Sequence, residues 1–337
     1  MPRLLALACA LLLAACAAQD PTAGPLTLQS QGSYFVGGTD TRSETLSTLP
    51  AYDASGTITV GQMYARYMAP PNAAPVKLVL VHGCCLTGKT WETTPDGRMG
   101  WDEYFVRRGF ETHVVDQTWR GRSAGSIAAI NAVKSGRAPA AQLPTVFQAS
   151  HEGAWAIFRF GNRYPEVHPG LRFPISAQNG LWQQMVPDWL NAQPTPNPTV
   201  PLLADLAQRL GRTVLISHSQ SGVYPFQAVQ HNAAGIAGLI SVEPGACPDA
   251  NADVTPYLRT PILVVWGDYV PGAPRWAPRL VNCRAFVAKV TAAGGRAEQL
   301  VLPDVGIRGN SHMLMQDDNS LEIAGMLVDW INRNTAR

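Results

Sequence analysis

The sequence predicts an α/β fold with a mostly parallel central sheet flanked by helices on both faces. Short, nearly continuous apolar runs alternate along the chain with segments of helical periodicity. Strands that are apolar on both faces are typical of parallel sheets buried between two helical layers. The chain has 337 residues, of which 46% are hydrophobic and 15% charged, so one large core can form. We therefore expect one large domain with a lid rather than two equal domains.

The expected elements follow from these runs in chain order. Strands are predicted at 76–81, 111–116, 213–216, 236–242, 261–266 and 298–302, and helices at about 101–108 and 224–230. Residues 33–36 and 58–67 carry alternating β-prone side chains that predict a hairpin at the start of the domain. The closing helix is expected at 321–334, with one apolar face made of Ile323, Met326, Leu327, Trp330 and Ile331.

The first residues are predicted to be a targeting segment. Arg3 precedes an apolar run of residues 4–13, too short to span a bilayer, and small residues follow. We assign 1–18 to a secretory signal peptide and 19–32 to a linker. Cys16 follows Leu-Ala-Ala in a form that resembles a lipobox, so a lipid anchor at Cys16 and ordinary cleavage just after it stay open. Export is expected, to the periplasm, to the outer membrane as a lipoprotein, or out of the cell.

Two further features concern organisation and partners. The net charge is +2 and the basic residues are scattered, so a nucleic-acid partner is not expected. Residues 33–337 are assigned to one domain, interrupted at about 125–208 by a segment rich in proline and aromatic residues. This insertion is expected to be a cap, its aromatics mainly packing together while one or two line an apolar pocket. The aromatics concerned are Trp155, Phe158, Phe160, Trp182 and Trp189.

Four cysteines lie beyond the predicted signal peptide: Cys84, Cys85, Cys247 and Cys283. An even set in an oxidising compartment favours disulfides. Either the adjacent pair bonds to itself and the distant pair to each other, or both neighbours cross to the distant cysteines. Neighbouring Cα atoms are about 3.8 Å apart, below the usual disulfide range of about 4.4–6.8 Å. The residues alone leave both pairings open.

Ser219 is the candidate nucleophile. The apolar run 213–216 ends abruptly in Ser-His-Ser-Gln-Ser-Gly, and a helical segment follows. This is the form of a nucleophile elbow, in which a sharp turn between strand and helix exposes a central serine. The outer positions must be small because the two backbones approach closely, and here both are serine, Ser217 and Ser221, rather than glycine.

The loop after the first apolar strand allows two interpretations. Gly83-Cys84-Cys85-Leu86-Thr87-Gly88-Lys89-Thr90 matches the phosphate-binding pattern G-x-x-x-x-G-K-[ST]. That pattern needs a helix at Lys89, yet Pro95, Gly97 and Gly100 follow, so the match is interpreted as coincidental. The favoured interpretation is an oxyanion hole, in which the backbone amides of Cys84 and Gln220 stabilise a negatively charged oxygen. His82 is expected to satisfy loop backbone groups rather than to react.

The base and the acid should follow the nucleophile along the chain. His312 lies in a loop between the last predicted strand and the closing helix, and the other histidines precede or adjoin Ser219 or lie in the next helix. We predict that His312 is the base. Glu243 and Asp268 each follow a predicted strand, and either carboxylate could orient the imidazole.

These motifs together resemble a small group of secreted bacterial α/β-hydrolase esterases, typified by an Alcaligenes esterase with a vicinal disulfide in its oxyanion hole. The resemblance is carried by Gly83-Cys84-Cys85, by 218–222, by Ser241-Val242-Glu243-Pro244-Gly245 and by His312. It extends from about residue 33 to the C-terminus. It implies Glu243 rather than Asp268 as the acid, a Cys84–Cys85 bond with a Cys247–Cys283 bridge, and a dimer. Ser217 departs from the glycine that many hydrolases have there.

The expected activity is hydrolysis of carboxylic esters through a Ser-His-Glu triad and an acyl-enzyme, with no cofactor and no metal. The substrate would be a small-molecule or polymeric ester. Two alternatives from other classes are a non-catalytic lipoprotein that keeps the hydrolase shell for binding, and a nucleotide-binding protein using residues 83–90.

Overall fold

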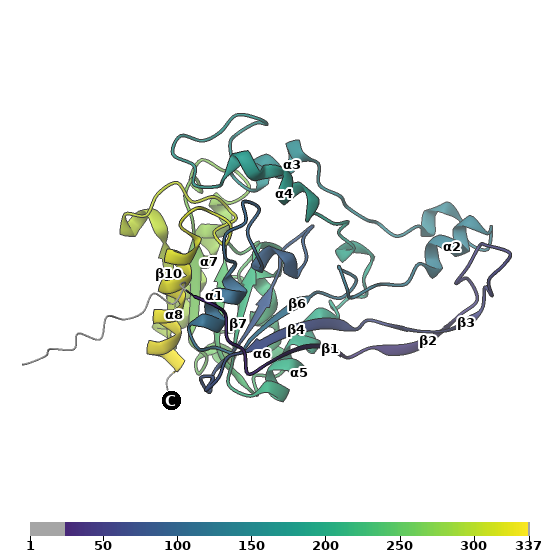
Figure 1. The fold of residues 1–337 in the computed structure, drawn as a ribbon, viewed down its shortest axis with the longest axis horizontal. Helices are drawn as coiled ribbons and strands as arrows, with labels where there is room; N and C mark the ends of the chain where they lie inside the picture. The colour runs from purple at the N-terminus through teal and green to yellow at the C-terminus, as the bar shows by residue number, and fades with distance from the viewer. Residues whose placement is uncertain (1–23, 336–337) are drawn as a thin grey trace, which may run out of the picture.

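The computed structural model describes residues 24–335 (Figure 1). The predicted signal peptide and Cys16 lie outside these residues. Within them the main sheet has eight strands in the order β1-β4-β6-β5-β7-β8-β9-β10, and β2 and β3 form a separate ribbon. Neighbouring strands from β6 to β10 in that order run parallel. β1 and β4 pair antiparallel at one edge, which makes the sheet mostly parallel as predicted.

The strands are β1 (Ser30–Val36), β2 (Thr39–Ser43), β3 (Gly56–Val60), β4 (Met63–Ala69), β5 (Lys77–Val81), β6 (Thr112–Asp116), β7 (Thr213–His218), β8 (Ile236–Val242), β9 (Ile262–Trp266) and β10 (Ala297–Val301). The α-helices are α1 (Trp101–Arg107), α2 (Ala128–Lys134), α3 (His151–Ile157), α4 (Gln178–Gln183), α5 (Thr199–Leu210), α6 (Tyr224–His231), α7 (Ala277–Ala292) and α8 (Ser320–Thr335). No helix in this part of the chain combines the length and apolar character needed to cross a membrane.

The parallel strands β5, β6, β7, β8 and β9 bury both of their faces, because helices cover the sheet on both sides. In β5, Leu78 and Leu80 belong to the core shared with α1 and α8, while Val79 and Val81 face the core shared with α5, α6 and α7. This alternation explains why the strands have near-continuous apolar sequences. The carboxyl ends of β5, β7 and β8 consequently lie together at one edge, which is where the candidate site forms.

The N-terminal prediction needs correction. Residues 58–67 do not form one strand, because Gly61 adopts a φ of +79° and divides them into β3 and β4. β4 pairs with β1 as a broad hairpin, whereas β3 pairs with β2. β1 also begins at Ser30, inside the predicted linker.

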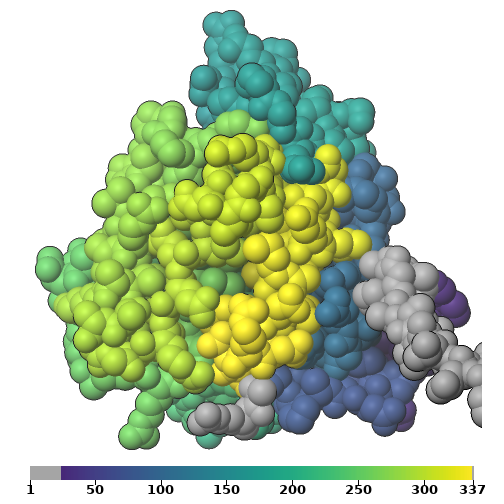
Figure 2. Space-filling model, turned by 90° about the vertical axis from the view of Figure 1, so that its left-hand side faces the viewer, coloured from purple at the N-terminus to yellow at the C-terminus, as the bar shows by residue number. Residues whose placement is uncertain are grey.

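The segment 125–208 is divided between a cap and the sheet layers. α3 and α4 lie above the carboxyl ends of the strands, at the top of the molecule in Figures 1 and 2. Trp155, Phe158 and Phe160 are buried there and pack against one another, within the same core as β5, α1 and α8. α5, however, packs against α6 and β7, so it is a layer helix rather than part of the cap.

An arm extends away from the sheet on the right of Figure 1. It consists of the β2–β3 ribbon with its connecting loop and of α2 with the residues around it. Thr45 donates a hydrogen bond to the Ala128 carbonyl (2.9 Å), and Asn131 donates to the Leu46 carbonyl (3.0 Å). Several large apolar side chains that are exposed in the described residues lie on this arm: Leu49, Tyr52, Ile127 and Leu143.

Candidate active site

Ser219 lies at a sharp turn between β7 and α6. Its φ of +56° is in the left-handed region, which a non-glycine residue adopts when the surrounding structure imposes it. The turn brings Gly222 so close to Pro244 that a Cβ at Gly222 would lie 2.6 Å from it. Ser217 and Ser221 are both buried, and the Ser221 hydroxyl donates to the Val81 carbonyl at 3.0 Å. The elbow therefore forms with serine at both outer positions.

His312 and Glu243 complete a chain of hydrogen bonds behind Ser219. His312 Nε2 lies 2.8 Å from Ser219 Oγ, and its Nδ1 lies 2.9 Å from Glu243 Oε2. His312 comes from the loop between β10 and α8, and Glu243 directly follows β8. The imidazole can therefore accept the serine proton at Nε2 while the carboxylate accepts a hydrogen bond from Nδ1.

Asp268 has other partners. Its two carboxylate oxygens accept hydrogen bonds from the amides of Tyr269 (2.7 Å) and Gly309 (2.9 Å). It therefore anchors the loop that carries His312 instead of contacting the imidazole. The structure brings Glu243, not Asp268, to His312.

Burial and charge set the protonation states of this pair. Burial lowers the pKa of His312 to about 4, although the hydrogen bond and charge of Glu243 act in the opposite direction. For Glu243, burial favours the neutral acid, but the Arg159 charge and the contacts with His312 outweigh it and lower the pKa to about 2. At neutral pH the pair consists of a neutral imidazole and a carboxylate, the states needed for a general base and its orienter.

Arg159 is a site residue that the sequence analysis missed. It follows α3 in the cap, is 1% exposed, and forms two hydrogen bonds with Glu243 at 2.6 and 2.7 Å. No local pattern indicates this pairing, because the partners are 84 residues apart and the cap sequence has no clear periodicity. Its φ of +56° is a further strained backbone position at the site.

Two other histidines support the site structurally. His218 Nε2 lies 2.9 Å from the His312 carbonyl, and burial lowers the pKa of His218 to about 3. His82 is buried, and its Nε2 accepts a hydrogen bond from the Gln117 amide at 3.0 Å. His82 therefore satisfies loop backbone groups, as the sequence analysis expected.

The loop after β5 lies against the elbow. Gly83 is close to Ser219, and among the described residues the amide of Cys84 has no acceptor. Gln220 stands in the first turn of a 3₁₀ helix (Ser219–Val223), where the backbone N–H groups have no partner within the helix. The two amides named as oxyanion donors are thus available for a ligand oxygen.

The same loop does not have the structure of a nucleotide-binding loop. A 3₁₀ turn of four residues (Gly88–Trp91) forms where that fold needs an α-helix. The amide of Gly88 donates to the Asp116 carboxylate at 2.7 Å, so an anion of the protein already occupies that donor. The Lys89 side chain donates to the Thr93 carbonyl, four residues further along the chain, at 2.5 Å. These contacts argue against the nucleotide interpretation.

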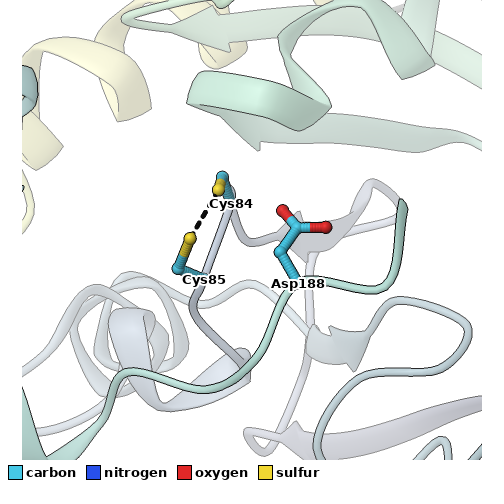
Figure 3. A group of neighbouring side chains, drawn as sticks. All are labelled: Cys84, Cys85 and Asp188. Carbon is cyan, nitrogen blue, oxygen red and sulfur yellow. Dashed lines mark hydrogen bonds between the residues drawn. The ribbon is translucent and has the colours of Figure 1, made fainter. Parts of the chain in front are cut away.

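Cys84 and Cys85 lie beside Asp188 of the cap (Figure 3). Their sulfur atoms are 2.6 Å apart, and both residues are free cysteines in the structure, so the vicinal bond stays a prediction. Asp188 pairs with buried Arg120 and accepts a hydrogen bond from the Gln220 side chain at 2.7 Å. This ionic network connects the cap to the residues on both sides of the expected oxyanion hole.

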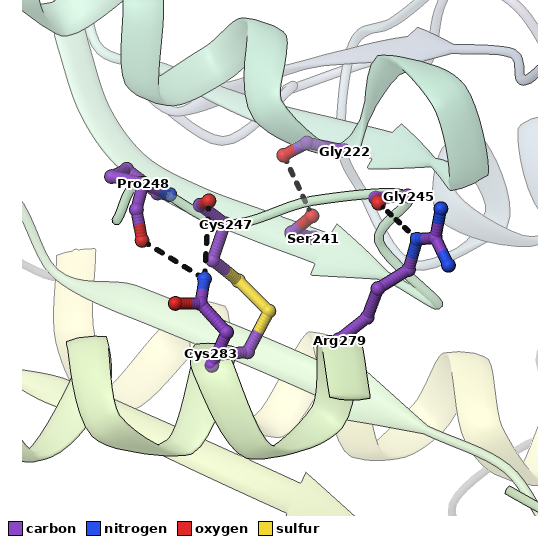
Figure 4. The surroundings of a disulfide bond; sticks show 8 residues. Gly222, Ser241, Gly245, Cys247, Pro248, Arg279 and Cys283 are labelled. Carbon is purple, nitrogen blue, oxygen red and sulfur yellow. Dashed lines mark hydrogen bonds between the residues drawn. A yellow bond between two sulfur atoms is a disulfide. The ribbon is translucent and has the colours of Figure 1, made fainter. Parts of the chain in front are cut away.

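Cys247 and Cys283 form a disulfide that ties the segment after Glu243 to α7 (Figure 4). Arg279 of α7 donates to the Gly245 carbonyl at 2.6 Å, two residues beyond Glu243. α7 therefore holds the loop that carries Glu243 by one covalent and one polar contact.

An apolar pocket of about 320 Å³ lies beside the expected oxyanion hole. Trp119 and Trp189 pack edge to face in its wall, with their ring centroids 6.3 Å apart. Val186, another lining residue, donates its amide hydrogen to the Cys85 carbonyl at 2.8 Å. Trp189 is thus a cap aromatic that lines a pocket, of the kind the sequence analysis expected.

Comparison with known proteins agrees with this architecture. No protein-family profile matches the chain. A curated relative, a probable secreted lipase from Fungal sp. (strain ATCC 74256), is 24% identical over 329 residues, which cover 80% of this chain and 86% of the relative. A solved bacterial esterase is 60% identical, covers 93% of this chain and 98% of its own, and superposes with a TM-score of 0.92.

The sheet order, the flanking helices and this likeness define an α/β-hydrolase. Within that class the chain belongs to the bacterial esterases that its motifs resemble, and it is an ester hydrolase.

Proposed function

We propose that the protein is an exported serine carboxylic-ester hydrolase in which Ser219, His312 and Glu243 are the nucleophile, the base and the acid. The observation that carries this proposal is the unbroken pair of hydrogen bonds from Ser219 Oγ through His312 to Glu243. All three residues are buried or nearly so, and they meet at the carboxyl ends of neighbouring strands.

The reaction proceeds in two halves. His312 Nε2 takes the proton of Ser219 as Oγ attacks the ester carbonyl, and the carbonyl oxygen gains a negative charge that the Cys84 and Gln220 amides stabilise. The imidazolium then donates that proton to the leaving alkoxide, which departs as an alcohol and leaves an acyl-enzyme. Water, deprotonated by His312, attacks the acyl-enzyme and releases the acid, and the proton returns to Ser219.

A fluorophosphonate probe tests the triad, because it labels a serine only when that serine is activated. Ser219→Ala should abolish both labelling and hydrolysis of p-nitrophenyl esters. Ser217→Ala is the matched control, since this neighbouring buried hydroxyl has no hydrogen-bond partner among the described residues. Retained labelling in Ser219→Ala would remove the elbow assignment.

The same assay separates the alternatives. A non-catalytic binding lipoprotein would not be labelled in its wild-type form. A nucleotide-binding protein would bind or hydrolyse ATP and also remain unlabelled.

We also propose that Cys84 and Cys85 are bonded in the exported protein. The proposal is supported by their adjacency, by the family resemblance and by the left-handed φ of +61° at Cys85. Intact mass before and after mild reduction should differ by the hydrogens of this one bond, because the Cys247–Cys283 pair is buried. Activity should fall on reduction without loss of the folded state. An unchanged mass and activity would contradict the bond.

Export is supported by the predicted signal peptide and by the secreted lipase among the relatives. Cell fractionation of the wild type and of Cys16→Ser would distinguish a lipid-anchored from a freely secreted protein.

We further propose a homodimer, supported by the exposed apolar side chains on the arm. Sedimentation of the purified protein tests it, and a monomer at micromolar concentration would contradict it.

A further inference from the structure

Arg159 is a cap residue that forms an ion pair with the acid of the proposed triad. Its guanidinium forms two hydrogen bonds with the Glu243 carboxylate, a two-point fork in which Nη1 lies 2.7 Å from Oε2 and Nη2 lies 2.6 Å from Oε1. Its third donor, Nε, bonds to the Asp268 carbonyl at 2.8 Å. All of this is buried, and a buried ion pair of this geometry holds both partners in one orientation.

This fork orients Glu243 toward the base. Glu243 Oε1 also accepts a hydrogen bond from the Gly267 amide, so this oxygen is turned away from His312. Oε2 is left to accept from His312 Nδ1 at 2.9 Å. Removing Arg159 would free the carboxylate to rotate about its terminal bond and would leave a buried charge without its partner.

The fork also places a positive charge next to the base. Arg159 Nη1 lies 3.4 Å from His312 Nδ1. With a neutral imidazole and a carboxylate, the Glu243–His312 pair holds one proton. A fixed cation at that distance opposes the binding of a second proton to either group. Arg159 accordingly acts with burial to lower the pKa of His312.

The other groups around His312 do not replace this charge. The His218 ring, 4.7 Å away between centroids, is kept neutral by burial, which lowers its pKa. The rings of Trp276 and Phe158 pack beside the imidazole, with centroids 4.1 and 6.0 Å from it, and carry no charge. Arg275 acts in the same direction as Arg159, but it is exposed and contributes less.

The cap contacts the base through its backbone as well. The His312 amide donates to the Phe158 carbonyl at 2.9 Å, one residue before Arg159. The two residues that follow α3 therefore hold both the proposed base and the proposed acid.

We infer that Arg159 is a positioning residue of the reaction: its guanidinium fixes Glu243 behind His312 and opposes protonation of this pair. The inference rests on the proposed triad. It assigns to the cap a part in the chemistry, in addition to covering the site.

The test is the pH profile of kcat/KM for p-nitrophenyl acetate, measured from about pH 3.5 to 8 with product quantified after quenching. In Arg159→Gln the acid limb should move to higher pH by about one to three units, because a neighbouring cation no longer opposes protonation. The plateau kcat should also fall by about tenfold to a hundredfold, as a displaced carboxylate orients the base less well.

Arg172→Gln is the matched control. Arg172 also joins the cap to the loop that carries His312, through the Arg308 carbonyl (2.8 Å) and Asp318 (3.0 Å), but it does not contact Glu243. It should leave the acid limb in place. An unmoved limb in Arg159→Gln, or an equal shift in both variants, would overturn the inference.

If Arg159→Gln does not fold, Arg159→Lys decides the question. Lysine keeps the positive charge but cannot form the two-point fork with Glu243. The acid limb of the pH profile should therefore stay near that of the wild type, while kcat falls at unchanged KM. A wild-type kcat would overturn the positioning role. Failure of the proposed function is distinguishable, because it would appear as an absence of fluorophosphonate label on wild-type Ser219.

Discussion

A Cβ atom placed on Gly83 would lie 2.8 Å from the Cβ of Ser219. This separation is too short for any side chain, so the loop after β5 can lie against the nucleophile only because residue 83 is glycine. The contact fixes the distance between the Ser219 hydroxyl and the Cys84 amide that follows Gly83. This close approach therefore keeps one proposed oxyanion donor, the Cys84 amide, next to the proposed nucleophile.

The first prediction ranks the two candidate acids. Glu243→Gln should lower kcat by about 10³–10⁴-fold, because an amide cannot hold the imidazole in the required tautomer. Asp268→Asn should cost far less, since Asp268 accepts from two backbone amides and does not contact His312. Steady-state kinetics on variants shown to be folded by circular dichroism check this ranking. The reverse order would reassign the acid.

The second prediction concerns pH. The proposed base, His312, can accept a proton only when neutral, and its lowered pKa of about 4 means that kcat/KM should persist to about pH 5 and fall near pH 4. The free energy of unfolding should also fall as the pH is lowered. In the unfolded chain this histidine has its ordinary pKa of about 6.5. Between about pH 6.5 and 4 the unfolded state therefore binds a proton that the folded state does not, and the free energy of unfolding falls.

Glu243 acts over a lower range. Its folded pKa of about 2 lies below the unfolded value, so its contribution is present above about pH 4.5 and is lost as the pH falls toward 2. Rate profiles and thermal melts across pH 3–8 test both statements. A half-maximal rate near pH 6.5 would contradict the assigned protonation state of His312.

The third prediction separates stability from catalysis. Cys247 and Cys283 close a loop with a sequence separation of 36 residues. Replacing both with alanine should lower the free energy of unfolding by about 4 kcal/mol, by the chain-entropy estimate for such a loop. The kcat of the folded variant should change little, because Arg279 still holds Gly245. Urea titration and kinetics at low temperature measure the two effects, and a lost kcat in folded protein would contradict the expected separation.

The fourth prediction concerns the acyl group of the substrate. The leaving alkoxide must lie beside His312, which protonates it, so the acyl group points to the opposite side, where Trp119 and Trp189 line a pocket. Trp189→Ala should reduce kcat/KM progressively with acyl length, by up to about fourfold for each methylene that no longer packs. Acetate esters should be least affected.

Trp182→Ala is the control for that experiment. Trp182 is a half-buried tryptophan of the cap that stacks on His151 and does not line this pocket. A uniform loss across the ester series in Trp189→Ala would place the acyl group elsewhere.

The sequence predicted the parts of the molecule that depend on local patterns. The apolar runs located the sheet strands β5 to β10 to within a few residues, and the position of His312 after the last strand indicated its place beside Ser219. The division of 58–67 was missed because the turn at Gly61 interrupts an otherwise regular alternation. The position of α5 in the sheet layers was missed because its amphipathic sequence directly follows the proline-rich stretch.

The acid could not be assigned from spacing, because Glu243 and Asp268 both follow strands. Their roles depend on which carboxylate points toward residue 312, and a buried cation in the cap contributes to that choice. Arg159 meets Glu243 across 84 residues of chain, a distance over which sequence periodicity carries no information.

The placement of Arg159 bears on how this enzyme can be engineered. A cap is commonly treated as a module that can be exchanged between hydrolases to change their selectivity. In this protein a graft would also remove Arg159, the counter-ion of Glu243 behind the proposed general base. An exchange that ended before residue 158, or resumed after residue 159, would preserve the proton-transfer machinery while the remainder of the cap was varied.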